Sequence, residues 1–128
     1  MKILIVDDEL LVRKSLGRAC RARGHEVVEA ADGQEGLMRW RETKPDLVFL
    51  DVLMPGMSGP EVLQAIEQDS VVGAASAGPR AKVILISAYS GEHNVETAHQ
   101  IGAHLFVPKP FEDIFEVVTK AEKLGGTQ

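Results

Sequence analysis

The sequence has few of the features that mark secreted or nucleic-acid-binding proteins. Of its 128 residues only Cys20 is a cysteine, so no disulfide can form within the chain. Lysine and arginine number 14 against 19 aspartates and glutamates, and the formal net charge of −5 leaves no basic excess to bind the phosphates of DNA or RNA. We therefore expect no direct nucleic-acid partner.

Long apolar runs are also missing. The first run, Ile3 to Val6, ends at Asp7, well before a secretory signal or a membrane span could be completed. We expect a cytoplasmic protein with no membrane insertion. A composition of 45% hydrophobic and 26% charged residues is that of an ordinary globular protein. The length fits one domain, expected over residues 1–124, with a tail or the start of a linker over 125–128.

Five short apolar runs rich in β-branched residues are candidate strands: Lys2–Val6, Glu26–Ala30, Asp46–Leu50, Lys82–Ser87 and His104–Val107. The first, third and fourth are apolar almost throughout, which is typical of parallel strands buried on both faces. The segments after the runs have the apolar spacing of helices, and we expect five of them. Right-handed crossovers then predict an α/β, doubly wound, flavodoxin-like sheet with five parallel strands in the order 2-1-3-4-5.

Two further features have simple structural interpretations. The stretch from Asp69 to Arg80 is small and weakly polar and ends in a Gly-Pro pair, which predicts a long loop after the third helix. The histidines lack the spacing of metal ligands and are expected at the surface; they are His25, His93, His99 and His104.

Acidic residues follow two of the predicted strands. Asp7, Asp8 and Glu9 follow the first strand, and Asp51 follows the third. These strands are neighbours in the expected order, and their carboxyl ends meet at the switch point where such sheets bind ligands. Carboxylates about 5 Å apart repel by roughly 3 kcal/mol at an effective dielectric near 20, so a bound cation is expected. Oxygen donors with few protein ligands favour Mg²⁺.

Two more polar residues are expected at the same edge of the sheet. Ser87 ends the fourth strand, and Lys109 comes just after the fifth. An ammonium group can neutralise the oxygens of a transferring phosphoryl group, a hydroxyl can donate a hydrogen bond to them, and a carboxylate can act as the nucleophile. The combination predicts a site that accepts a phosphoryl group.

Four segments resemble the receiver domain of two-component response regulators, in order and over nearly the whole chain. They are Ile5–Glu9, Asp51–Gly59, Ser87–Ala88 and Gly102–Phe111. The resemblance implies that Asp51 is the phosphoacceptor. It also implies that Asp8 and Asp51 bind Mg²⁺ directly, Asp7 binds it through water, and Leu53 binds it through its backbone carbonyl.

The resemblance assigns the remaining residues to a conformational switch. Lys109 would pair with the phosphoryl group, Ser87 would close on it, and the Phe106 ring would follow. The Lys109–Pro110 bond would be cis, which proline permits. Phe106 stands where the family often has tyrosine, so it lacks a hydroxyl to present to a partner.

The resemblance also implies the partners. A sensor histidine kinase or a phosphotransfer protein would supply the phosphoryl group, and a downstream protein target or output domain would respond. The protein would then be no enzyme beyond its own phosphorylation and dephosphorylation. Two alternatives remain: a receiver fold that only binds partners, and a Mg²⁺-dependent phosphohydrolase. Leu53 weighs against the hydrolase, because a second carboxylate two residues after Asp51 would be needed as general acid and base.

Overall fold

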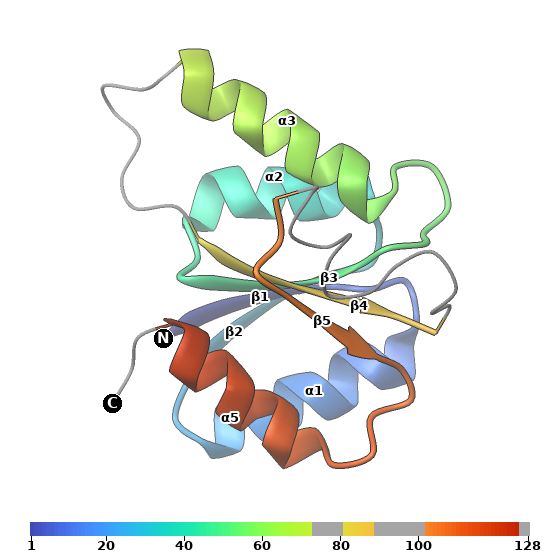
Figure 1. Cartoon of the computed structure of the whole chain (residues 1–128), viewed down its shortest axis with the longest axis vertical. Helices are drawn as coiled ribbons and strands as arrows, with labels where there is room; N and C mark the ends of the chain where they lie inside the picture. Colours follow the sequence, from blue (N-terminus) through green and yellow to red (C-terminus); the bar gives the residue numbers. More distant parts are fainter. Residues whose placement is uncertain (73–80, 89–101, 126–128) are drawn as a thin grey trace.

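The computed structural model describes residues 1–72, 81–88 and 102–125. Strands and helices alternate along the chain (Figure 1). They are β1 (Lys2–Val6), α1 (Leu10–Ala22), β2 (Glu26–Ala30), α2 (Gly33–Thr43), β3 (Leu47–Asp51), α3 (Gly59–Val72), β4 (Lys82–Ser87), β5 (Leu105–Pro108) and α5 (Ile114–Gly125). Within the described ranges, no helix combines the length and the apolar character needed to cross a membrane.

The strands form one parallel sheet in the order β2-β1-β3-β4-β5, which confirms the predicted topology. Helices α2 and α3 cover one face of the sheet, and α1 and α5 cover the other (Figure 1). The helix expected between the fourth and fifth strands falls mainly on residues 89–101, outside the described residues.

Both faces of the sheet are apolar. On the side of α2 and α3, the core includes Leu4, Leu50 and Leu85. On the opposite side, Ile5 of β1 and Phe49 of β3, which are directly opposite each other in the sheet, pack with residues of α1 and α5. Each fully buried side chain of this size contributes about 1.5–3 kcal/mol to stability. The strand ends that carry the polar residues are therefore held in a rigid frame.

The predicted loop from Asp69 onward is wrong at its start, because α3 continues to Val72. Arg41 of α2 holds Asp69 through two contacts, Nε to Oδ2 at 2.7 Å and Nη2 to Oδ1 at 3.0 Å. This pair ties the last turns of α3 to the neighbouring helix. Residues 73–80 of the predicted loop lie outside the described residues.

The surface prediction is also wrong for His25, and it holds only in part for His104. The His25 side chain is only 7% exposed, and its Nε2 lies 2.7 Å from Glu122 Oε2 of α5. His104 is half-buried, and its Nδ1 accepts a hydrogen bond from the Val83 N–H at 3.1 Å. Both rings have polar partners far away in the sequence, which makes their burial possible. His93 and His99 lie outside the described residues.

Helix α2 approaches the end of β1 closely at Gly36. A Cβ built at Gly36 would lie 2.6 Å from Val6 Cγ1, and Val6 is fully buried. At Gly17 in α1 the nearest atoms to such a Cβ are 3.4 Å away, an ordinary contact. Only a glycine at position 36 therefore lets α2 pack at its present depth beside the residue that precedes Asp7.

We expect Gly36→Ala to destabilise the protein by about 1–3 kcal/mol through overpacking, although alanine favours helix formation. Gly17→Ala should be neutral or stabilising by up to about 1 kcal/mol, because the same change meets no close atom there. Urea unfolding of both variants measures the two free energies. Equal effects of the two substitutions would contradict the packing argument.

Candidate functional site

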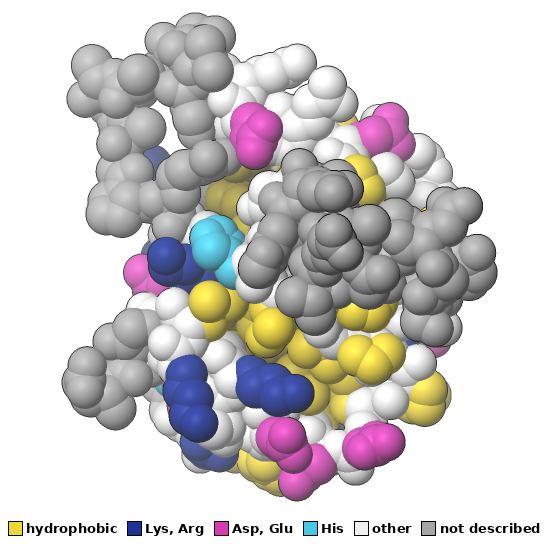
Figure 2. Space-filling model, viewed as in Figure 1, with side chains coloured by type: hydrophobic (Ala, Val, Ile, Leu, Met, Phe, Trp, Pro, Cys, Tyr) yellow, Lys and Arg dark blue, Asp and Glu magenta, His cyan; other side chains and the backbone are white. Residues whose placement is uncertain are grey.

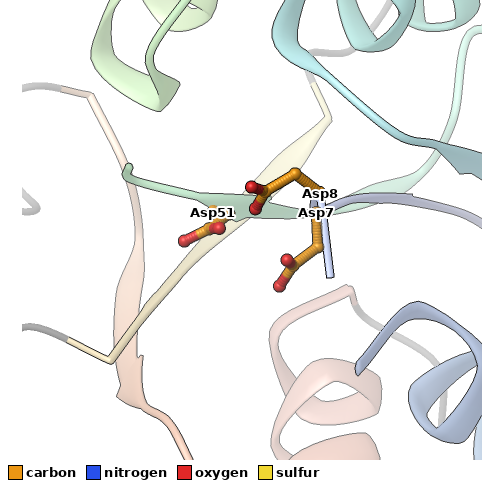
Figure 3. Close-up of side chains that lie close together, drawn as sticks. All are labelled: Asp7, Asp8 and Asp51. Carbon is orange, nitrogen blue, oxygen red and sulfur yellow. The ribbon is translucent and has the colours of Figure 1, made fainter. Parts of the chain in front are cut away.

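Three aspartates meet where β1 and β3 end (Figure 3). Asp7 follows β1, Asp51 ends β3, and the two strands are paired through Val6 and Leu50. Oxygen atoms of Asp7, Asp8 and Asp51 all lie within 4.8 Å of one another. Asp7 is fully buried and Asp51 is 3% exposed, whereas Asp8 is exposed to solvent. The predicted convergence of carboxylates is confirmed.

Hydrogen bonds fix both the side chain and the backbone of Asp7. The Oδ1 atom of Asp7 accepts a hydrogen bond from the Glu9 N–H at 2.8 Å. Arg13, in the first turns of α1, donates from Nη1 to the Asp7 carbonyl oxygen at 2.8 Å. The carboxylate of Asp7 therefore has a set orientation, with Oδ2 directed to another partner.

That partner is Lys109, which comes from the loop after β5. Its Nζ lies 2.9 Å from Asp7 Oδ2, 2.8 Å from Glu9 Oε1 and 3.5 Å from Asp51 Oδ2. The side chain of Lys109 is only 5% exposed. A buried ammonium thus sits among carboxylates from two other segments of the chain.

The loop that carries Lys109 is held against β4. The Lys109 N–H donates to the carbonyl oxygen of Ser87 at 2.8 Å, and Ser87 is the buried last residue of β4. The Lys109–Pro110 peptide bond is cis, as the family resemblance implies. Phe106 lies within β5, opposite Leu85 of β4, and is half-buried against the core on the α2 and α3 side.

The loop between β3 and α3 passes close to Asp51. The Gly59 N–H donates to the Val52 carbonyl at 3.0 Å, and a Cβ at Gly59 would clash with the Asp51 carbonyl oxygen. Pro60 lies in the first turn of α3, where its missing N–H costs little. Leu53 is in this loop with an exposed side chain. Its role as a carbonyl ligand stays a prediction.

The charges shift the proton affinities of the site. Burial and the nearby charge of Asp7 raise the pKa of Asp51 from its ordinary 3.8 to about 7, against the opposing influence of Lys109. Burial alone would lower the pKa of Lys109. Hydrogen bonds to Glu9 and Asp7, together with the charge of Asp51, instead raise it. Lys109 is therefore a permanent cation, whereas the charge on Asp51 is costly.

The ion pairs of Lys109 with carboxylates and the contact of Arg13 were not expected from the sequence. Glu9 was counted among the acidic residues of this edge, but not as a partner of Lys109, 100 positions further along the chain. Arg13 was not identified at all. The helical spacing from the end of β1 could have shown that Arg13 points back toward the strand end, whereas no local signal pairs Glu9 with Lys109.

Comparison with known proteins identifies the family of this chain. Residues 3–121 match the response regulator receiver domain family. The chain is 37% identical over 126 residues to the chemotaxis protein CheY of Listeria monocytogenes, covering 96% of this chain and 99% of that protein. It is also 37% identical over 110 residues to the probable transcriptional regulator ycf27 of Guillardia theta, covering 86% of this chain and 40% of that protein.

A solved structure with the same fold is the N-terminal domain of an uncharacterized protein from Wolinella succinogenes. It is 34% identical to this chain with a TM-score of 0.79, and the match covers 97% of this chain and 93% of that one. Because the family match extends over residues 3–121 and both the relatives and the fold agree with it, this chain belongs to the receiver domain family of two-component response regulators.

Proposed function

We propose that Asp51 accepts a phosphoryl group from a phosphohistidine of a sensor histidine kinase or phosphotransfer protein, in a reaction that depends on Mg²⁺. The observation that carries the proposal is the position of Lys109 Nζ, 3.5 Å from Asp51 Oδ2 and beside the Asp7 carboxylate. A carboxylate nucleophile, a fixed cation and a cluster of oxygen ligands together fit phosphoryl transfer.

In the proposed reaction, a carboxylate oxygen of Asp51 attacks the phosphorus atom of the donor. The new O–P bond forms as the N–P bond of the phosphohistidine breaks. The electron pair of that bond stays on the imidazole nitrogen, and the ring leaves neutral because its other nitrogen is protonated. Asp51 must be ionised to attack, so its raised pKa has to be compensated by positive charge.

The donor atoms at this edge fit a hard divalent cation. Asp7, Asp8 and Asp51 offer only oxygen ligands, all within 4.8 Å of one another. The charge of Asp7 contributes to the raised pKa of Asp51, a repulsion that a cation would relieve. We propose that Asp8, Asp51 and the Leu53 carbonyl bind Mg²⁺ directly and Asp7 through water. Bound Mg²⁺ supplies positive charge to the phosphoryl oxygens.

Lys109 and Ser87 would recognise the phosphoryl group after transfer. The ammonium of Lys109 is already beside Asp51 and can neutralise one phosphoryl oxygen. Ser87 is next to Lys109 in space, because its carbonyl oxygen accepts a hydrogen bond from the Lys109 N–H at 2.8 Å. A hydrogen bond donated by the Ser87 hydroxyl would then draw the end of β4 toward the phosphoryl group, and Phe106 on the adjacent strand would follow.

A partner protein would recognise this movement at the surface beside β5. Hydrophobic side chains gather where β5 runs toward α5, with lysine, aspartate and glutamate side chains around them (Figure 2). Phe115, at the start of α5, is 49% exposed. The relatives include a chemotaxis protein and a transcriptional regulator. We therefore propose that the downstream partner is either a separate protein target or an output domain.

Incubation with acetyl phosphate and Mg²⁺ should add one phosphoryl group to the protein, detected by intact mass spectrometry. Asp51→Asn should abolish the gain because the nucleophile is removed, and chelation of Mg²⁺ should abolish it in the wild type. Asp46→Asn is the matched control. This aspartate lies just before β3 and should leave labelling intact.

A mass gain retained by Asp51→Asn would contradict the proposal. No gain with either acetyl phosphate or a phosphohistidine donor would favour a binding module without phosphorylation. Continuous release of phosphate from metabolites, well above self-dephosphorylation, would favour the phosphohydrolase.

The raised pKa of Asp51 also predicts a pH-dependent stability without Mg²⁺. A carboxyl group with a higher pKa in the folded chain loses its stabilising proton as the pH rises from about 4 to about 7. Asp51→Asn should therefore raise Tm by about 5 °C at pH 8 and by less at pH 5. Calorimetry in a chelator measures this, and saturating Mg²⁺ should remove the difference. An Asn variant less stable than wild type at pH 8 would contradict the prediction.

A further inference from the structure

Lys109 makes its two shortest contacts with carboxylates other than that of Asp51. A lysine ammonium has three N–H donors. One is directed at Asp7 Oδ2 at 2.9 Å and one at Glu9 Oε1 at 2.8 Å, and the 3.5 Å distance to Asp51 Oδ2 is too long for a strong charge-assisted hydrogen bond. An oxygen bound on Asp51 has to compete with these two short contacts for a close approach to Nζ.

The two acceptors differ in how easily they can be released. Asp7 is fully buried, and its second oxygen accepts the Glu9 N–H at 2.8 Å. Losing the ammonium would leave a buried carboxylate without its cation, which is costly. The Glu9 side chain is 57% exposed, so its carboxylate can regain water when the contact opens. Glu9 is therefore the partner that Lys109 can exchange.

Glu9 also opposes a phosphoryl group by its charge. Lys109 Nζ is within ion-pair distance of both Glu9 and Asp51, so the two carboxylates share one cation. An incoming phosphoryl group brings further negative charge to the same ammonium. In the unphosphorylated protein Glu9 stabilises the ammonium, and in the phosphorylated protein it competes with the phosphoryl oxygens.

We infer that Glu9 is a positioning residue that holds Lys109 in the unphosphorylated state and is exchanged for a phosphoryl oxygen when Asp51 is modified. The inference rests on the proposed function and adds a regulator to the same site. It implies that the carboxylate of Glu9 lowers the affinity of the site for phosphoryl-like anions. The residue at position 9 thus determines how readily a phosphoryl oxygen on Asp51 binds the ammonium of Lys109.

The test uses beryllofluoride, a phosphoryl analogue, with the full chain at saturating Mg²⁺. Glu9→Gln keeps the size of the side chain but removes its charge, and should lower the Kd for beryllofluoride about three- to tenfold. The ammonium signal of Lys109, observed by NMR, should differ between wild type and Glu9→Gln in the free proteins. The two signals should coincide once beryllofluoride is bound, because Glu9 has then been released.

Glu112→Gln provides the matched control. Glu112 is an exposed carboxylate three residues after Lys109, so its removal changes the net charge equally and should leave the Kd unchanged. Separate Mg²⁺ titrations ensure that every variant is saturated with Mg²⁺. This is needed because removing the charge of Glu9 also weakens the attraction of the site for Mg²⁺.

An unchanged or higher Kd for Glu9→Gln would overturn the inference, as would a Lys109 signal that still responds to the substitution in the bound state. In either case the proposed function still stands if the wild type binds beryllofluoride and is phosphorylated on Asp51. If the wild type neither binds beryllofluoride nor accepts a phosphoryl group, the proposed function and the inference fall together.

Discussion

The ammonium of Lys109 connects strand ends that lie far apart in the sheet. β5 is three strand spacings from β1, about 14 Å, a distance that the four-carbon stem of a lysine cannot span alone. The Lys109 N–H donates to the Ser87 carbonyl, which keeps the backbone after β5 beside the end of β4. The side chains of Lys109 and Asp7 together cover the remaining distance.

This arrangement makes the charges mutually dependent. Without Lys109, Asp7 and Asp51 would be buried carboxylates facing each other, and without the carboxylates Lys109 would be a buried cation with no partner. The apolar packing on both faces of the sheet supplies the stability that keeps such a cluster in place. The clustered charges of the site thus lower the stability of the fold, and the apolar core compensates for this loss. Such clusters of charge are common at functional sites.

The parts of this arrangement that follow from local patterns could be predicted. Uninterrupted apolar runs identify the buried strands, and the strand order then places Asp7, Asp8 and Asp51 together. The role of Ser87 as a hydrogen-bond donor follows from its position at a strand end and stays a prediction. The switch roles of Ser87 and Phe106 remain proposals that come from the family resemblance. The correctly expected cis bond at Pro110 has the same origin.

Features that depend on contacts between distant segments could not be predicted. The last turns of α3 contact Arg41 of another helix, and the buried His25 ring pairs with Glu122 near the other end of the chain. The pairing of Glu9 with Lys109 has the same character. Periodicity and turn propensity describe neighbours in sequence, so they contain no information on these pairs.

The contacts of Met1 have a practical consequence for handling the protein. The Met1 amino group lies 3.0 Å from His25 Nδ1, and the Met1 sulfur packs against Gly125 at the end of α5. These contacts are at the start of β1, at the opposite edge of the sheet from Asp51 (Figure 1). An affinity tag or fluorophore attached to Met1 would therefore disturb the junction between β1 and α5, while leaving the carboxyl edge free for measurements of phosphorylation.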